Sequence, residues 1–243
     1  MIDNSDIIKR LNNGELVKIN NFLNIKDFNN LKNKVTNIIN EKGKKYFRLN
    51  DNELDKYNLR DIFLRNNIDS LSSDILLDNE IDNSKKVDTH TVLRVLSGKN
   101  NKKGANEYHF DSFLITLMLP IIIPQKKLNT GKFLIIPNIR KIQKFFIFSL
   151  IQKIILQNRL IRKILTLSIT KRILKATEVN LEENSLYIFY GYKSFHGSSS
   201  LVNDTTRVTF LHHVYRPHNE SKINKLIFKR RNIKEKHRSD DNK

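Results

Sequence analysis

Two histidines and one aspartate provide the side chains from which proteins build an open iron site. His109 and Asp111 stand two positions apart, at the start of an apolar, β-branched run that predicts a strand. Because side chains at i and i+2 of a strand point to the same face, both can reach one ion. His196 supplies a second imidazole farther along the chain. Two imidazoles and one carboxylate on one octahedral face are what an oxygen-activating non-haem iron needs, with three positions left open.

Composition narrows the metal sites and partners that are open to the chain. Its 243 residues include 7 His and no Cys. Thiolate zinc sites, iron–sulfur clusters, disulfides and cysteine nucleophiles are therefore excluded, and His and carboxylate must hold any metal. The 44 Lys+Arg residues exceed the 25 Asp+Glu residues by 19, a charge that suits nucleic acid, membrane surfaces or phosphorylated substrates. Since Lys, Asn and Ile are abundant everywhere in the chain, this charge alone assigns no partner.

The hydrophobic pattern predicts a single domain over residues 1–220 that is mainly β-structure preceded by helices. Residues 15–22 are typical of a short strand, and apolar residues at helical spacing over 28–39 predict an amphipathic helix that stops at Gly43. Residues 44–88 predict mixed short helices and loops. Within about 89–217, β-branched and aromatic runs predict core strands at 89–96, 109–119, 132–136, 185–190 and 206–215. Such strands are typical of a sandwich or barrel.

Two further segments differ from this core. Residues 139–176, rich in Ile, Leu, Lys and Arg without Gly or Pro, predict a helical insertion between core strands. A basic stripe over 159–170 would let residues 142–170 touch an anionic membrane, cover a lipid-like substrate as a lid, or pack on the barrel. The charge-dense tail, residues 221–243, is expected to be mobile. No apolar run approaches the roughly 20 residues that span a membrane, and no secretory signal is evident, so we expect a cytoplasmic protein, with peripheral membrane association as an alternative.

With these residues, the chain resembles the iron(II)- and 2-oxoglutarate-dependent oxygenase superfamily over about residues 15–217. In that superfamily a His-x-Asp motif and a distal His are followed, about ten residues later, by an Arg for the tail carboxylate of 2-oxoglutarate. Arg207 lies eleven residues after His196. The stretch from His196 through Asn203 to Arg207 is similar to the phytanoyl-hydroxylase-like branch, and the prolyl-hydroxylase-like branch is the alternative. The gap from Asp111 to His196 is longer than usual because of the predicted insertion.

The resemblance implies a fold, cofactors and further site residues. The fold would be a double-stranded β-helix, a cupin-like jelly roll, with N-terminal helices, and the chemistry would use Fe(II), 2-oxoglutarate and O2. Arg207 would bind 2-oxoglutarate, because a guanidinium grips a carboxylate bidentately and keeps its charge. Thr209, on the same predicted face, could add a hydroxyl. Four residues are candidates for substrate contacts or for support of the ligands: Arg94, Tyr108, His213 and Tyr215.

Three of these candidates also have an ordinary structural interpretation. Arg94 lies within an apolar run, so it is either an anion anchor, a substrate contact or a charge on an edge strand that faces water. His213 and Tyr215 share the strand parity of Arg207 and would line the cleft or simply fill the barrel. No catalytic residue is expected beyond the metal ligands.

The expected activity is hydroxylation of an unactivated C–H bond in a small-molecule or lipid-like substrate. The resemblance disfavours halogenation, since the halogenases of the superfamily generally replace the carboxylate ligand, here Asp111, with a small residue. Two alternatives stay open: a metal-binding jelly-roll protein or zinc hydrolase with the same three ligands, and a non-enzymatic basic protein that binds membrane surfaces. Nucleic-acid binding is not favoured, because the basic tail offers only Phe228 for base stacking. Neither the substrate nor the oligomeric state follows from the sequence.

Overall fold

The computed structural model describes most of the chain: residues 3–62, 68–82, 87–97, 108–125, 130–143, 176–202 and 205–217, with isolated positions 148, 151, 152, 158, 164, 167 and 226. The described helices are α1 (Asn4–Asn12), α2 (Ile25–Lys42), α3 (Asp51–Lys56), the short 3-10 helix η1 (Arg60–Ile62) and α4 (Ile68–Asp78). The described strands are β1 (Val17–Ile19), β2 (Phe47–Asn50), β3 (Thr89–Ser97), β4 (Ile115–Ile122), β5 (Phe133–Ile136), β6 (Thr177–Val179), β7 (Leu186–Phe189), β8 (Phe195–Ser198) and β9 (Thr206–Val214).

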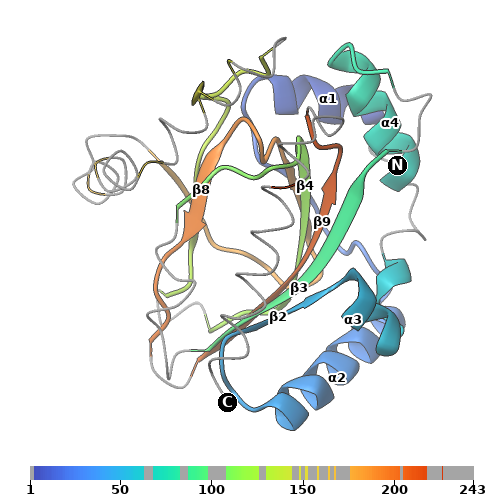
Figure 1. Cartoon of the computed structure of the whole chain (residues 1–243). Coiled ribbons are helices and arrows are strands. Elements are labelled where there is room, and N and C mark those ends of the chain that lie inside the picture. Colours follow the sequence, from blue (N-terminus) through green and yellow to red (C-terminus); the bar gives the residue numbers. More distant parts are fainter. Residues whose placement is uncertain are drawn as a thin grey trace.

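The strands form two antiparallel sheets that pack face to face (Figure 1). The larger sheet has the order β1-β7-β4-β9-β3-β2, and the smaller has the order β6-β5-β8. Their inner faces meet in an apolar cluster that joins Met118 of β4 and Phe189 of β7 to Phe133 of β5. Two such sheets around inward-facing side chains make a jelly roll. The predicted double-stranded β-helix core and the predicted N-terminal helices are thus confirmed.

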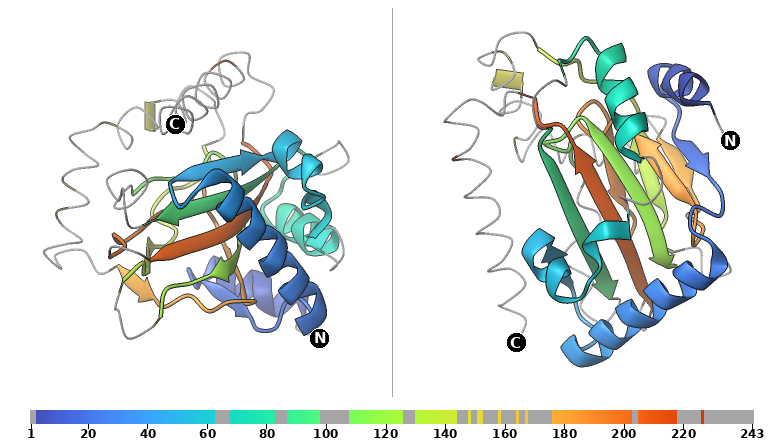
Figure 2. Two further views of the ribbon diagram at one scale, coloured as in Figure 1. Left: turned by 90° about the horizontal axis from the view of Figure 1, so that it is seen from below. Right: turned by 90° about the vertical axis from the view of Figure 1, so that its right-hand side faces the viewer.

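Helices cover the outer face of the larger sheet. α2 begins after Asn24, whose side chain accepts a hydrogen bond from the backbone N–H of Asp27 at 2.9 Å. It ends at Gly43, whose φ of 83° favours glycine. Leu31 and the other residues of its apolar stripe are buried with Phe210 of β9 in the main core. Figure 2 shows α2 alongside this sheet, so the N-terminal segment supports the strands from which the site is built.

The alternation of side chains along β9 decides which residues face the space between the sheets. Val208 and Phe210 belong to the core beneath the helices, whereas Leu211 packs against the cluster between the sheets. Successive strand residues point to opposite faces. The residues that share the inner face of β9 are therefore Arg207, Thr209, Leu211 and His213. A central strand of the fold thus presents polar and charged groups to its interior.

The structure also differs from the predicted strands in two respects. The strand predicted over 109–119 is wrong in its first half, because β4 begins only at Ile115 and His109 takes part in a single bridge with His196. The sequence pattern does not predict β2, β6 or β8. These strands have 4, 3 and 4 residues, and they form by pairing with β3 and β5, which are distant in sequence.

Several predictions fall on residues that the structure does not describe. The helical insertion predicted over 139–176 lies mostly outside the described residues, as does the tail over 221–243. The domain boundary at residue 220, the tail and the role of residues 142–170 therefore stay predictions. Among the residues that are described, no helix is both long and apolar enough to cross a membrane.

Candidate metal centre

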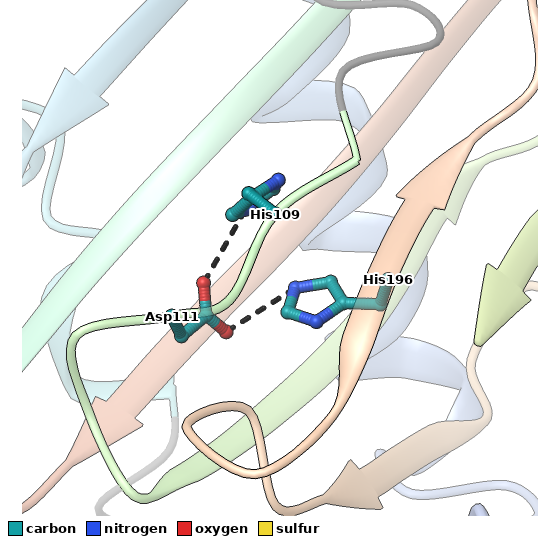
Figure 3. A group of neighbouring side chains, drawn as sticks. All are labelled: His109, Asp111 and His196. Atoms are coloured by element: carbon teal, nitrogen blue, oxygen red, sulfur yellow. Dashed lines mark ion pairs between the residues drawn. The ribbon is translucent and has the colours of Figure 1, made fainter. Parts of the chain in front are cut away.

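The three predicted metal ligands converge on one point between the sheets (Figure 3). His109 Nε2 lies 3.4 Å from Asp111 Oδ1, and His196 Nε2 lies 3.4 Å from Asp111 Oδ2. One ligand atom from each residue lies within 4.8 Å of the other two. Since metal–nitrogen and metal–oxygen bonds to such ligands are about 2.0–2.2 Å long, a single ion can bond to all three side chains.

Long-range backbone pairing, rather than one continuous strand, brings these ligands together. The backbone N–H of His109 donates to the carbonyl of His196 at 2.9 Å, and that of His196 donates back to His109 at 3.0 Å. The N–H of Asp111 donates to the carbonyl of Gly191 at 3.0 Å. Residues 109–111 are therefore held between β8 and the turn that follows β7, and this clamp fixes where the side chains point.

The imidazole of His196 is oriented for metal binding. Its Nδ1 lies 3.0 Å from the backbone carbonyl oxygen of Ser194. A carbonyl oxygen can only accept, so Nδ1 carries a proton and Nε2, on the side of Asp111, is the nitrogen available to a metal. The ring is 5% exposed and packs 4.9 Å from Phe189 and 5.8 Å from Phe133, measured between ring centroids. These contacts fix both the tautomer and the plane of the ligand, as metal sites require.

The carboxylate of Asp111 accepts a hydrogen bond from a threonine hydroxyl, which in turn contacts a further imidazole. Thr116 Oγ1 donates to Asp111 Oδ2 at 2.6 Å, and it lies 3.0 Å from Nδ1 of His213. Because a threonine hydroxyl has one proton, which goes to the carboxylate, His213 must donate its Nδ1–H to the threonine oxygen. Hydrogen bonds therefore run in one direction, from His213 to Thr116 and from Thr116 to the metal ligand Asp111.

Burial and neighbouring charge set the protonation states of this chain. Burial alone would raise the pKa of the Asp111 carboxyl, but the imidazoles of His196 and His213 and the hydrogen bonds from His109 and His196 hold that pKa well below its usual value. Burial lowers the pKa of His213 to about 3. At neutral pH Asp111 is therefore an ionised ligand, and His213 is a neutral donor.

Gly191 leaves just enough room for the Asp111 carboxylate. A Cβ placed on Gly191 would overlap Thr116 Oγ1 and Asp111 Oδ2, and it would lie 3.0 Å from Asp111 Cβ. Position 191 therefore requires glycine, since any side chain there would displace the carboxylate of Asp111 or the hydroxyl of Thr116.

Arg207 is buried on the inner face of β9, with 3% of its surface exposed. Its Nη1 donates to the carbonyl oxygen of Gly131 at 3.0 Å, and its Nη2 lies 3.9 Å from the sulfur of Met118. Nε is buried and has no hydrogen-bond partner among the described residues. Burial and the charge of Arg94 lower the pKa of Arg207 to about 9, so the group is a cation at neutral pH. A buried cation with a donor left over is a site for an anion.

Arg94 is on the same inner face, one strand away. It lies directly opposite Thr209 in the β3–β9 pair and opposite Arg48 in the β2–β3 pair. β3 is flanked by β9 and β2, so Arg94 does not lie on an edge strand, and that interpretation of the residue is wrong. Thr209 is buried and stands two positions from Arg207, as its parity predicts.

Tyr108 and Tyr215 pack into apolar clusters other than the one between the sheets. Tyr108 stacks on Phe195, with ring centroids 5.9 Å apart, in a cluster on the side of β8 opposite to His196. Tyr215 follows the last residue of β9 with a φ of 57°, and it packs against the core beneath the helices. The reversal of the backbone at this position breaks the alternation on which the prediction for Tyr215 depended.

Two residues that hold Asp111 in place were not predicted. Thr116 and Gly191 act on Asp111 through contacts that no local motif encodes, and the only signal was a glycine between two tyrosines. Arg48 lies in β2, a strand that the pattern did not reveal, so its pairing with Arg94 could not be anticipated.

Comparison with known proteins agrees with this architecture. No protein-family model matches the sequence, and no curated protein resembles it in sequence. The structure is similar to AviO1 from Streptomyces viridochromogenes Tue57, with a TM-score of 0.59 and 12% identity over 90% of this chain and 97% of that one. It is also similar to the non-haem α-ketoglutarate-dependent carbocyclase SnoK from nogalamycin biosynthesis, with a TM-score of 0.58 and 11% identity over 90% of each chain. A prolyl-4-hydroxylase from Pseudomonas putida matches with a TM-score of 0.51 and 9% identity over 88% of this chain and 99% of that one. At such identities the likeness establishes a shared fold.

Proposed function

We propose that this chain is a non-haem iron(II)- and 2-oxoglutarate-dependent oxygenase. The observation that carries the proposal is the convergence of His109, Asp111 and His196 on one point, inside a fold shared with α-ketoglutarate-dependent enzymes. Two imidazole nitrogens and one carboxylate oxygen are the ligand set of such iron sites, and they leave positions open for cosubstrate and O2. An iron ion bound here would supply the O2 activation that protein side chains cannot perform.

Arg207 supports the assignment of 2-oxoglutarate as cosubstrate. Thr116 touches Asp111 at 2.6 Å, and Met118 touches Arg207 at 3.9 Å. Thr116 and Met118 are two positions apart on one face of β4, a step of roughly 7 Å. The two positions of β4 that contact Asp111 and Arg207 are thus separated by about the length of a short dicarboxylate. The buried Nε of Arg207 would be satisfied by the distal carboxylate, and the Thr209 hydroxyl lies on the same face to assist.

The protein's own contribution is to orient ligands and to exclude water. Ser194 and Thr116 fix the directions of His196 and Asp111. Phe133 and Phe189 pack against the His196 ring, so that side of the site is apolar. A dry, preorganised site strengthens every electrostatic contact made within it.

Hydroxylation of a C–H bond in a small-molecule or lipid-like substrate is the proposed reaction type. Asp111 retains the carboxylate that the halogenases of this superfamily generally lack, which supports hydroxylation over halogen transfer. A zinc hydrolase could use the same three ligands, but it has no use for a buried arginine with donors to spare. The role of residues 142–170 as a lid or a peripheral membrane contact stays a prediction.

Succinate formation tests the proposal. Purified protein with Fe(II), ascorbate, O2 and 2-oxoglutarate should release succinate slowly even without a prime substrate. Arg207→Ala should weaken 2-oxoglutarate binding by at least about 100-fold, because a paired charge-assisted grip is lost. Arg10→Ala, which removes an exposed guanidinium from α1, is the matched control and should turn over like wild type. Tight metal binding without succinate would point to the zinc alternative and overturn the proposal.

A further inference from the structure

We propose that Arg140 is a positioning residue for the metal centre: its guanidinium, stacked on Phe110 and Tyr192, holds the segment that carries His109 and Asp111 in the orientation that binds the ion. The proposal rests on the metal centre of the proposed oxygenase. It does not depend on turnover, because the affinity of the protein for a metal ion measures it directly.

Phe110 lies between two metal ligands in the sequence and packs on the other side of the backbone. His109 and Asp111 point toward the candidate ion site, whereas Phe110 belongs to the apolar cluster on the far side of β8 from His196. The side chain is 1% exposed, and its ring centroid lies 5.2 Å from that of Phe195. Because the residues on either side of Phe110 are metal ligands, any displacement of its ring moves one or both of them.

Arg140 joins Phe110 to the turn that holds Asp111. Its Cζ lies 5.7 Å from the ring centroid of Phe110 and 3.7 Å from that of Tyr192, within the roughly 6 Å over which an aromatic face attracts a cation. Its Nη2 donates to the Tyr192 hydroxyl at 2.7 Å. Tyr192 directly follows Gly191, whose carbonyl accepts the backbone N–H of Asp111. One guanidinium therefore contacts both segments that meet at this ligand.

Packing alone does not account for a charge at this position. Arg140 is 2% exposed. Burial lowers the pKa of its guanidinium, and among the described residues the opposing influence is the Tyr192 hydroxyl rather than a carboxylate. A buried charge without an opposite charge is costly, and an apolar side chain of similar volume would avoid that cost. An apolar side chain would lack the directional contacts of the planar guanidinium. These contacts to Phe110 and Tyr192 are what the arginine adds.

Arg140 also connects the metal centre to a distant part of the chain. Its Nε donates to Oε1 of Gln152 at 2.9 Å. Gln152 belongs to the stretch 139–176 that the sequence predicts as an insertion. The amide oxygen limits rotation of the guanidinium plane, so its removal should loosen the contacts of Arg140 with the two rings. Loss of this one hydrogen bond should lower metal affinity in the same direction as loss of Arg140, but by less.

Metal affinity separates positioning from simple support of the fold. Co²⁺, which stands in for Fe²⁺ without oxidising, is titrated calorimetrically into metal-free protein whose near-ultraviolet circular dichroism matches wild type. Arg140→Met keeps an unbranched chain but removes the charge and the donors, so Co²⁺ binding should weaken by about 10- to 100-fold. Arg140→Lys keeps the charge but loses the planar fork, and it should fall between Arg140→Met and wild type.

Asn184→Ala is the matched control. Asn184 is buried, and its side chain bonds the backbone N–H of Leu23 at 3.0 Å and the carbonyl of Leu23 at 2.8 Å. Its removal should make unfolding in urea easier, as removal of Arg140 should, because buried hydrogen bonds are lost. Since Asn184 contacts neither ligand segment among its described partners, this variant should bind Co²⁺ like wild type.

Two further measurements test whether Arg140 acts through Phe110. Arg140→Met and Phe110→Leu together should weaken Co²⁺ binding by less than the product of the two single effects, because both changes break the same contact. The visible absorption of bound Co²⁺ reports the arrangement of its ligands. At saturating Co²⁺ this spectrum should change in Arg140→Met and keep the wild-type form in Asn184→Ala.

The outcomes separate this inference from the proposed function. Wild-type Co²⁺ affinity and spectrum in Arg140→Met, or an equal loss of affinity in Asn184→Ala, would overturn the inference and leave the oxygenase proposal intact. Multiplicative effects of Arg140→Met and Phe110→Leu would overturn the route through Phe110. If Arg140→Met does not fold, Arg140→Lys and Gln152→Ala decide. A wild-type protein that binds Co²⁺ but forms no succinate would count against the proposed function alone, and one that binds no Co²⁺ would overturn the metal centre and this inference together.

Discussion

Replacing Gly191 by alanine should weaken metal binding without strain in the backbone. A Cβ at this position would overlap the carboxylate oxygen of Asp111 and the hydroxyl of Thr116, which are themselves joined by a 2.6 Å hydrogen bond. The φ of Gly191 lies outside the left-handed range that favours glycine, so the added methyl group acts only through this contact. Either Asp111 must turn away from the histidines or Thr116 must release it.

The size of the effect follows from what is displaced. Loss of a group that orients a metal ligand typically weakens metal binding by about 10- to 100-fold, which corresponds to roughly 1.4–2.8 kcal/mol. Displacement of the ligand itself lies at the upper end of this range. We therefore expect Gly191→Ala to bind Co²⁺, a redox-stable stand-in for Fe²⁺, about 100-fold more weakly than wild type.

Gly43→Ala is the matched control, because at Gly43 an added methyl group would strain the backbone but would contact no other residue. Gly43 has a φ of 83°, and a Cβ there would meet nothing within 4 Å. That variant should lose about 1–2 kcal/mol of unfolding free energy to backbone strain and keep its metal affinity. The affinities are measured by anaerobic calorimetry and the stabilities by urea unfolding. Wild-type Co²⁺ affinity in Gly191→Ala, or an equal loss in Gly43→Ala, would show that Gly191 does not set the position of Asp111.

Three further changes probe the support of the site. Burial lowers the pKa of His212 to about 4. An exposed imidazole titrates near 6.5, so as pH falls from about 6.5 to 4 the unfolded chain takes up a proton that the folded chain refuses, and the unfolding free energy should fall by up to about 3 kcal/mol. Because the buried His213 also refuses a proton over this range, urea unfolding at both pH values should show a loss in His212→Gln that is smaller than in wild type by up to about 3 kcal/mol; equal losses would contradict the prediction. In Gly197→Ala the new Cβ would lie 2.8 Å from a ring carbon of Tyr108, so unfolding should be easier by about 1–3 kcal/mol, and an unchanged urea midpoint would rule out this contact. Tyr192→Phe removes the hydroxyl that accepts from Arg140 at 2.7 Å and should cost about 1–3 kcal/mol; a chemical denaturation curve that matches wild type would show that this hydrogen bond is not needed.

The metal ligands and the anchor arginine could be found in the linear sequence because few residue types can do this chemistry. Without cysteine, only histidine and carboxylate remain as ligands, and His109, Asp111, His196 and Arg207 have a spacing that resembles one superfamily. The long amphipathic helix and the longer strands could be predicted as well, since burial of one face leaves a period of 3.6 or 2 in the chain. These features depend on residues that are close in sequence.

Strand parity predicts the direction of a side chain only where a regular strand exists. Thr209 and His213 share the face of Arg207, because β9 runs unbroken over these positions. Tyr215 does not follow this parity, because the backbone turns there with a φ of 57°. His109 and Asp111 converge as expected although they lie in no continuous strand, because pairing with His196 and Gly191 holds them.

The order of residues along the chain therefore indicates which side chains can bind a metal. The folded structure determines the positions and orientations of those side chains. Gly191 is 80 positions from Asp111, and Arg48 is 46 positions from Arg94, yet each pair is in direct apposition. Such partners leave no periodic trace, because their proximity is created by pairing between distant strands and by close packing of the interior. Residue type and spacing fix the available chemistry, and nonlocal contacts fix the geometry in which it can occur.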